Sequence, residues 1–425
     1  MRVLFVTPVE QGSGETITVL HMARTLVAEG NEVRFLASAF AEWFLGTTFG
    51  PTVRQLTSSG SRNRELWEEA LALFDPDVVV LADYPLLFFA DGVSPLAAER
   101  GWVASLDSVR PCLVTLDHFG FAQREMGMFV GPPHLTFGYQ LFPAVPERMR
   151  ILLPCPMHEP GPVAGRRGHP FRYWDVPLSL PDDRRAALRR TYLRDEDGYL
   201  VAHLVSNWAW RGSEAYGLSF YRYLPRLFDA YFAAAGRPVT VVSVNNGRLL
   251  EPPVASRLSL VNAAPMTPDA FESLLLGADL VLTENRVSIS LGKAVCGLQP
   301  CAVLKNSHRL LDILETAAPE VREVVQAMEG AQPGTIYPYD VFPTGMVQEL
   351  KDLVLYRDNS LTQAFGQVEV FGGPSAAEQL CGLLADPTAR DGLREHQRVY
   401  VDRLAALEDA AAVLSRLVDQ ERSMA

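Results

Sequence analysis

Long hydrophobic runs are missing from this chain, because its longest apolar stretches have only the length of a β-strand. We therefore expect no contact with a membrane. The opening MRVLFVTP is too short an apolar run for a signal peptide and is followed at once by polar residues, which favours a cytoplasmic protein. Positive charge is scarce too. Lys and Arg number 38 against 50 Asp and Glu, and the net charge of −12 argues against a nucleic-acid partner.

Signatures of metal sites and of several enzyme classes are also absent. The five cysteines include no CxxC pair, which predicts free thiols in a reducing compartment. The eight histidines form no HxxxH or HExxH pattern, so the sequence predicts no metal site. Neither a P-loop nor a GxSxG elbow occurs. These absences argue against the common zinc hydrolases, P-loop NTPases and α/β-hydrolases.

Apolar segments of strand length alternate with amphipathic helical segments through the first half of the chain. Buried parallel strands have uninterrupted apolar sequences, and such runs occur at 3–6, 33–37, 77–82 and 112–116. The first helix is expected to end at Gly30. Its apolar face would comprise Ile17, Leu20, Ala23 and Val27. This alternation predicts an α/β fold with a parallel sheet covered by helices on both faces.

The alternation stops at about 153–181, where proline and glycine are dense and an interdomain linker is expected. Further strands follow at 200–205, 239–244 and 278–283. We therefore predict an N-terminal Rossmann-like domain at 1–180, which includes the linker, and a second doubly wound domain at 181–390.

The C-terminal segment 391–425 has the pattern of one long amphipathic helix. Its apolar residues Leu393, Tyr400, Leu407 and Leu414 recur every seven positions. Packing of this helix on the body of its own chain is one interpretation. The alternative is a short coiled coil that would make a homodimer.

The most informative segment is 278–307, ADLVLTENRVSISLGKAVCGLQPCAVLKNS. Its pattern predicts a buried strand, a polar turn, a helix that begins at Ser288 or Ser290 and ends at Gly297, and another strand. A helix that starts just beyond a parallel strand directs free backbone N–H groups and its positive dipole end at that edge of the sheet. The segment therefore predicts a site for an anion, above all a phosphate.

Two such domains, a proline-rich middle and a returning C-terminal helix resemble the GT-B class of glycosyltransferases. The opening MRVLFVTPVEQGSGETITVLHMARTLVAEGNEVRFLAS resembles the first β–α–β unit of that class, and 278–307 resembles the donor-binding unit of its peptidoglycan-type GlcNAc transferases. The resemblance implies two Rossmann-like domains that face each other across a cleft. It also implies a nucleotide-sugar co-substrate held on the second domain, a small acceptor on the first, and no metal or other cofactor.

One departure from the GT-B pattern concerns the donor ribose. Many members carry a glutamate early in the donor helix that hydrogen-bonds this ribose, whereas this sequence has Gly292 and Lys293 at that level. The nearest acidic residue is Glu284, in the preceding turn. Either Glu284 takes the ribose role, or the nucleotide is held differently.

Candidate donor-binding residues lie where strands of the second domain end. Hydroxyl groups and cationic side chains there would bind and neutralise a diphosphate, although the same residues also suit an ordinary helix cap, a turn or an aromatic interdomain contact. The candidates are Ser206, Asn207, Trp208, Arg211, Asn245, Glu284, Asn285, Arg286, Ser288, Ser290 and Lys293.

Candidate catalytic residues lie where strands of the first domain end. An inverting transfer needs one base near the acceptor, and a carboxylate beside an imidazole would supply it. The candidates are Asp117, His118 and Glu15. The residues expected to line the acceptor side are Gly12, Ser13, Gly14, Asp83 and Tyr84. A turn aspartate, an exposed histidine and a first-turn glutamate favoured by the helix dipole are the structural alternatives.

The sequence thus predicts a hexosyltransferase-type GT-B enzyme. It would transfer a sugar from a nucleotide sugar to an oxygen, nitrogen or sulfur of a small soluble acceptor, in bacterial specialised metabolism such as antibiotic biosynthesis. One rival is a UDP-sugar 2-epimerase on the same fold. The other is a catalytically inactive, glycosyltransferase-like partner protein.

Overall fold

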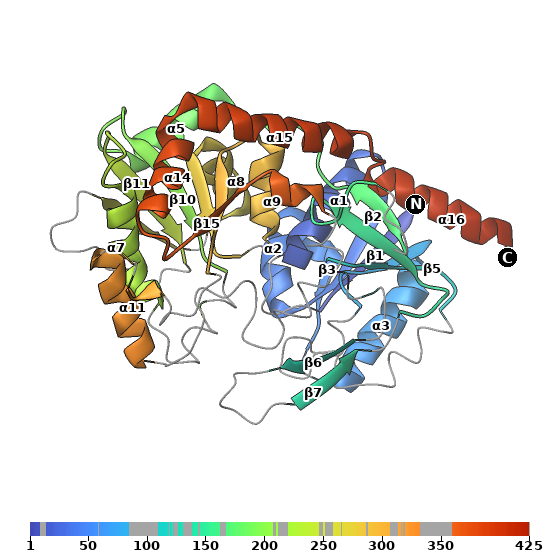
Figure 1. Cartoon of the computed structure of the whole chain (residues 1–425). Coiled ribbons are helices and arrows are strands. Elements are labelled where there is room, and N and C mark those ends of the chain that lie inside the picture. Colours follow the sequence, from blue (N-terminus) through green and yellow to red (C-terminus); the bar gives the residue numbers. More distant parts are fainter. Residues whose placement is uncertain are drawn as a thin grey trace.

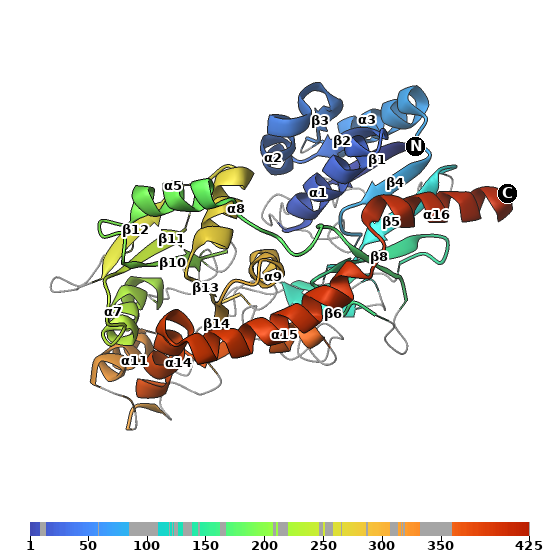
Figure 2. The same ribbon diagram turned by 90° about the horizontal axis from the view of Figure 1, so that it is seen from above.

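The computed structural model of the chain contains two α/β domains, which Figures 1 and 2 show from two directions. The described residues are 1–8, 14–57, 59–84, 109–118, 120, 122, 126–130, 138–142, 145–161, 167–206, 210, 220–245, 250, 258–264, 266–285, 288–306, 313–315, 317, 319–331 and 359–424.

The first domain is built on a seven-stranded sheet in the order β3-β2-β1-β4-β5-β8-β9, in which all neighbouring strands are parallel. The strands are β1 (Arg2–Thr7), β2 (Glu32–Ala37), β3 (Val53–Gln55), β4 (Val78–Leu81), β5 (Cys112–Leu116), β8 (Arg150–Cys155) and β9 (His169–Arg172). An antiparallel hairpin of β6 (Met126–Val130) and β7 (Gly138–Phe142) is separate from this sheet. The helices are α1 (Gly14–Ala28), α2 (Ala39–Phe49), the 3₁₀ turn η1 (Gly50–Thr52) and α3 (Gly60–Phe74).

The second domain repeats this design with six parallel strands in the order β12-β11-β10-β13-β14-β15. The strands are β10 (Tyr199–Leu204), β11 (Val239–Val244), β12 (Ser259–Ala263), β13 (Leu280–Thr283), β14 (Cys301–Lys305) and β15 (Gly366–Glu369). Its helices are α5 (Asp182–Tyr192), α7 (Phe220–Phe232), α8 (Pro268–Gly277), α9 (Ile289–Cys296), α11 (Pro319–Ala331), the 3₁₀ turn η5 (Ser360–Gln363) and α14 (Pro374–Ala385). The predicted α/β class with two parallel sheets is therefore confirmed.

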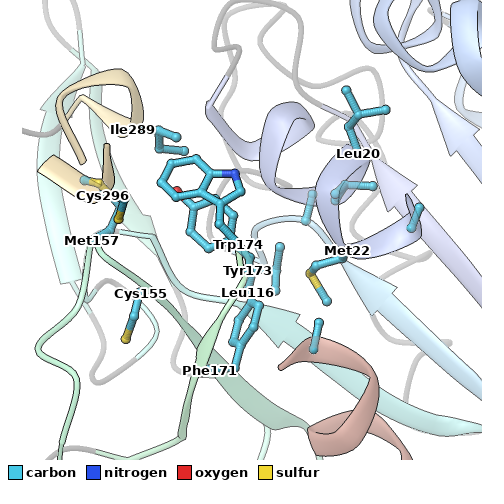
Figure 3. Close-up of a cluster of buried hydrophobic side chains, with 14 of the residues drawn as sticks. Leu20, Met22, Leu116, Cys155, Met157, Phe171, Tyr173, Trp174, Ile289 and Cys296 are labelled. Atoms are coloured by element: carbon cyan, nitrogen blue, oxygen red, sulfur yellow. The ribbon is translucent and has the colours of Figure 1, made fainter. Parts of the chain in front are cut away.

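An apolar cluster joins the two domains. Figure 3 shows Trp174, which follows β9, between Ile289 and Cys296 of α9 on one side and Leu20 and Met22 of α1 on the other. All five side chains are buried. Complete burial of a large apolar side chain contributes roughly 1.5–3 kcal/mol, so this cluster holds α1 beside α9.

The C-terminal segment forms two helices where the sequence predicted one. Helix α15 (Pro387–Ala405) starts on the second domain, and α16 (Ala410–Met424) packs on α1, β5 and β9 of the first domain (Figures 1 and 2). The apolar face of α16, including Leu414 and Leu417, is buried in this contact. Packing on its own chain therefore accounts for the apolar repeat, and no coiled-coil dimer is needed to cover it. No helix in the described ranges combines the length and the hydrophobicity that a bilayer crossing requires.

The chain crosses between the domains twice, and the two crossings are in contact. The first lies between β9 and α5, and the second lies between α15 and α16. The backbone N–H of Arg172 donates to the carbonyl of Glu408, 3.0 Å away, and Arg172 forms a single β-bridge with Asp409. The segment 153–181, predicted as linker alone, thus also contributes the end of β8 and all of β9 to the first sheet.

Another difference from the sequence interpretation concerns α1. Val27, which we placed on the apolar face, is 46% exposed, whereas Thr16 and Thr18 are buried. Helix α1 packs against the sheet on one side and against α2 and α16 on its other sides. Its buried surface is therefore broader than a single apolar stripe. Gly30 follows the helix at φ +81°, a conformation that suits glycine, as expected for a helix end.

Candidate functional site

Three titratable side chains of the first domain meet at one edge of its sheet. Glu15 lies in the first turn of α1, Asp83 follows β4, and His118 follows β5. Strands β1, β4 and β5 are adjacent and parallel, so their carboxyl ends bring these residues together. One oxygen or nitrogen of each lies within 4.8 Å of the others, and the three residues are 5%, 1% and 1% exposed. We call this group the first-domain cluster.

The orientation of the His118 ring is set by Thr18. The Nε2 atom of His118 lies 3.1 Å from Thr18 Oγ1, and the hydroxyl of Thr18 donates to the carbonyl of Gly14, also at 3.1 Å. Because that hydroxyl proton is already used, Thr18 accepts the hydrogen bond from His118. The proton of a neutral His118 ring is therefore on Nε2, and the lone pair is on Nδ1. This Nδ1 atom lies 3.8 Å from Asp83 Oδ2.

Burial raises the pKa of the Glu15 carboxyl and lowers the pKa of the His118 imidazole, so the two values move towards each other. Desolvation raises the pKa of the Glu15 carboxyl, an effect that His118 opposes and the charge of Asp83 reinforces. Desolvation lowers the pKa of His118, against the influence of Glu15 and Asp117. A carboxyl group that binds a proton more readily than usual next to a neutral imidazole is suited to general acid–base chemistry.

Two other sequence candidates have different surroundings. Asp117 is outside the three-residue cluster. Its backbone N–H donates to the carbonyl of Leu152 at 2.9 Å, and its carbonyl accepts from His158 Nε2. Tyr84, which we expected to line the acceptor side, is only 2% exposed, and its side chain belongs to an apolar core cluster of the first domain. The backbone of Asp117 is thus held in place while its carboxylate acts electrostatically on His118, and Tyr84 packs in the core. Gly12 and Ser13 lie outside the described residues.

A row of polar side chains crosses the second sheet near the carboxyl ends of its strands. His203 of β10, Ser243 of β11 and Asn262 of β12 are register partners, so they share one face of the sheet. His203 Nδ1 lies 2.9 Å from Ser243 Oγ, and His203 Nε2 lies 2.7 Å from Glu284 Oε1. Asn245 donates to Ser243 Oγ at 3.3 Å and to Asn262 Oδ1 at 2.9 Å. We call these residues the second-domain network.

The sequence candidates Glu284 and Asn245 belong to this network, whereas His203, Ser243 and Asn262 were missed. Each missed residue is a polar side chain near the carboxyl end of a mostly apolar strand, in LVAHLV, VTVVSV and SLVNA. That shared pattern is a usable signal, since polar groups in buried strands need partners. The register that aligns the three positions is a property of the folded sheet.

The N-terminus of α9 has the predicted cap. Ser288 Oγ accepts the backbone N–H of Leu291 at 3.4 Å, and the N–H of Asn285 donates to Thr283 Oγ1 at 3.1 Å. Ser290 lies in the first turn and is partly exposed. Ser206, at the end of β10, has a buried hydroxyl without a hydrogen-bond partner among the described residues. Asn207, Trp208, Arg211 and Arg286 lie outside those residues.

Lys293 faces the interdomain contact and not the N-terminus of α9. Its ammonium group forms an ion pair with Glu272 of α8, lies 3.3 Å from His21 Nε2 and is 5.1 Å from the centre of the Trp174 ring. Its side chain is only 8% exposed. The sequence interpretation placed Lys293 on the donor phosphates. That role stays a prediction; in the structure the face of α9 that carries Lys293 is turned towards α1.

Gly292 explains the departure at the expected ribose glutamate. A Cβ at this position would lie 2.5 Å from Pro156 Cγ, so α9 approaches the segment after β8 too closely for a larger residue. A glutamate therefore does not fit at 292 in this packing. Glu284 is the buried carboxylate of this region that the structure places at a strand end.

The N-termini of α1 and α9 meet at the domain interface. A Cβ on Gly14, the first residue of α1, would lie 2.9 Å from Cδ1 of Ile289, the first residue of α9. Each of these helices follows the end of a central strand of its own sheet. Two positive dipole ends therefore point into one region, with Glu15 next to the contact on one side and Ser288 next to it on the other.

A family model described as a family of unknown function (DUF6365) matches residues 22–422, and the chain therefore belongs to this family. None of the curated proteins matches. Solved structures with similar folds include the spinosyn rhamnosyltransferase SpnG complexed with spinosyn aglycone. It has 17% sequence identity and a TM-score of 0.52 over 98% of this chain and 100% of that one.

Two further structures match along the whole chain. The glycosyltransferase VinC in complex with dTDP has 14% identity and a TM-score of 0.52, with 100% of both chains covered. A protein from Listeria monocytogenes assigned as a UDP-N-acetylglucosamine 2-epimerase has 13% identity and a TM-score of 0.51, with 100% of this chain and 97% of that one covered. The fold of this chain is thus the GT-B fold of natural-product glycosyltransferases, as the sequence resemblance implied.

Proposed function

We propose that this member of a family of unknown function is a glycosyltransferase that transfers a sugar from a nucleotide-sugar donor to a small acceptor of specialised metabolism. The observation that carries the proposal is the meeting of the α1 and α9 N-termini, between a titratable cluster on one domain and a hydrogen-bonded network on the other. A transferase of two substrates needs two such surfaces side by side.

The donor would bind at the second domain. Its diphosphate would accept hydrogen bonds from the free N–H groups at the start of α9 and from the Ser288 and Ser290 hydroxyls, where the helix dipole favours negative charge. Arg211 and Arg286 are the cationic residues that we assign to charge neutralisation. Glu284, oriented by His203, would accept hydrogen bonds from hydroxyl groups of the ribose. No metal is required at the diphosphate in this arrangement.

The acceptor would bind at the first domain. Nδ1 of His118 carries the lone pair that can take a proton from the acceptor nucleophile, and the carboxylate of Asp83 beside it would stabilise the resulting imidazolium. The released nucleoside diphosphate would remain at α9, where the N–H groups stabilise the charge that develops on the leaving group.

A thermal-shift and calorimetry series with dTDP-, UDP-, GDP- and ADP-sugars tests the proposal. A bound nucleotide raises the melting temperature by mass action, and Ser290→Ala should reduce that increase. Release of nucleoside diphosphate should then require an acceptor. If no nucleotide sugar changes the melting temperature, the inactive partner protein becomes the better interpretation.

The fold likeness to the assigned 2-epimerase supports a second candidate, because an epimerase also needs acid and base groups around the sugar. The two reactions differ in their products. An epimerase would invert C2 of a UDP-sugar without any acceptor and would incorporate deuterium from D₂O at C2. A transferase would do neither.

A further inference from the structure

We propose that Glu15, Asp83 and His118 bind a divalent first-row transition-metal ion such as Zn²⁺ or Mn²⁺. The three side chains offer two carboxylates and one imidazole, a ligand set that suits such ions better than Mg²⁺ or Ca²⁺, which prefer oxygen ligands alone. They come from three different elements, α1 and the segments after β4 and β5, so the fold holds them independently of any local motif.

The spacing of the ligand atoms suits a single ion. Three atoms that lie at most 4.8 Å apart share a central point about 2.8 Å or less from each, and zinc–ligand distances of about 2.0–2.2 Å are then reached by small side-chain rotations. The contact between His118 and Asp83 is compatible with an ion between them. The 3.8 Å between His118 Nδ1 and Asp83 Oδ2 exceeds the length of a hydrogen bond but leaves room for a bridging ion.

The hydrogen bond on the far side of the imidazole also suits metal binding. A histidine ligand usually donates its second ring N–H to a fixed acceptor, which selects the tautomer and directs the lone pair at the metal. His118 donates from Nε2 to Thr18 Oγ1, whose own proton is committed to the Gly14 carbonyl. The Nδ1 lone pair is therefore directed towards the two carboxylates.

Charge at the cluster provides an independent argument. Glu15 is 5% exposed, and its Oε2 atom has no hydrogen-bond partner among the described residues. The described side chains that act electrostatically on Glu15 are His118 and Asp83, of which only the histidine can be positive. Two carboxylates buried beside each other destabilise the fold unless a proton or a cation offsets them. A divalent cation would neutralise both and would supply Oε2 with a partner.

Three protein ligands leave coordination positions for water or for an oxygen of another molecule. On the basis of the proposed function, that molecule is the acceptor. With the ion bound, Nδ1 of His118 would serve as its ligand and not as the base, and the acceptor oxygen held by the ion would lose its proton to solvent more readily. The inference departs from the metal-free site that the resemblance to GT-B enzymes implies.

Metal binding can be measured without an activity assay. The full chain is treated with EDTA, dialysed and titrated by calorimetry with ZnCl₂ and with MnCl₂, and Co²⁺ is added to a separate sample. We expect one ion per chain and visible d–d absorption bands from bound Co²⁺. Asp83→Asn should weaken binding at least ten-fold. Thr18→Val, which keeps all three ligands but removes the acceptor for Nε2–H, should weaken it about 10–100-fold.

Glu284→Gln is the matched control, since it alters the buried carboxylate–histidine pair of the other domain. Its metal affinity should equal that of the unsubstituted protein. Absence of stoichiometric binding by the unsubstituted protein would overturn the inference, whether or not the variants fold. The inference would also be overturned if Asp83→Asn and Glu284→Gln reduced the metal affinity equally. Titration of dTDP into the EDTA-treated protein tests the donor site separately, so a failure of the proposed function is recognised on its own.

Discussion

The first-domain cluster and the second-domain network occupy equivalent edges of two similar sheets, yet their side chains are connected differently. In the second domain, Glu284, His203 and Ser243 form an unbroken chain of hydrogen bonds that Asn245 and Asn262 extend, with lengths of 2.7–3.3 Å. In the first domain, His118 and Asp83 stand 3.8 Å apart, and burial shifts the pKa values of Glu15 and His118 in opposite directions.

This difference indicates a division of labour. A continuous chain of hydrogen bonds restricts the orientation of each side chain, which suits recognition of a group that does not change during a reaction. Buried titratable groups held close together are suited to a change of charge during a reaction. The comparison therefore predicts that substitutions in the first domain reduce the rate, whereas substitutions in the second domain reduce donor affinity.

The largest expected effect is on the rate. His118→Gln removes the imidazole that serves as base or, with the ion bound, as ligand, but keeps a polar side chain of similar reach, so turnover should fall about 10²–10⁴-fold. The donor affinities of the variant and of the unsubstituted protein should differ by about two-fold at most, because His118 lies on the domain that does not hold the donor. Steady-state kinetics with calorimetry of nucleotide binding measures both. A parallel loss of donor affinity would contradict the division between the domains. Asp117→Asn, measured alongside, shows whether the neighbouring carboxylate contributes to the rate.

The second effect is on donor affinity. Glu284→Gln replaces a charge-assisted acceptor by a neutral amide, and loss of such a hydrogen bond costs about 1.5–3 kcal/mol, or roughly 10–100-fold in affinity. The turnover number at saturating donor should change much less. Calorimetric titration with the nucleotide and a full kinetic profile separate the two quantities. A reduced turnover number at unchanged affinity would assign Glu284 to the chemistry instead.

The third effect is on stability at the domain contact. Gly292→Ala places a methyl group against Pro156, and overpacking of this kind costs about 1–3 kcal/mol. The melting temperature should fall accordingly. Gly46→Ala is the control, since that position lies inside α2 with no atom within 4 Å of the added Cβ. There, alanine should be neutral or stabilising by up to about 1 kcal/mol.

The smallest expected effect is on the loss of stability at low pH. Burial and the neighbouring Lys293 hold the pKa of His21 well below its usual value. The unfolded chain therefore takes up a proton near about pH 6.5, whereas the folded protein does so only at lower pH, and stability falls as the pH drops below this value. His21→Gln should reduce the decrease in melting temperature between pH 7.5 and pH 5.5. The exposed His396, replaced in the same way, should leave the decrease unchanged.

The sequence was informative about the first-domain cluster because of a local rule. Polar residues directly after apolar strands converge when the strands are parallel neighbours, and Glu15, Asp83 and His118 were all identified in this way. The capped start of α9 was found by a similarly local pattern at Ser288. Neither inference needed knowledge of how the two domains pack.

What the sequence did not reveal depends on long-range packing. The alignment of His203, Ser243 and Asn262 requires the register of three strands, which their separate sequences do not encode. The burial of Lys293 depends on which face of α9 meets α1. The break after α15 arises because α16 packs on the first domain, while the heptad pattern alone continues through it.

The contact between the two chain crossings has a mechanical consequence. Arg172 and Glu408 join the two connections through a backbone hydrogen bond, so the two crossings are held side by side where they pass between the domains. If the domains opened as rigid bodies, they would rotate about the two joined crossings, and the N-termini of α1 and α9 would move apart. Without α16, only the crossing between β9 and α5 would connect the domains firmly, and the domains could twist as well as open.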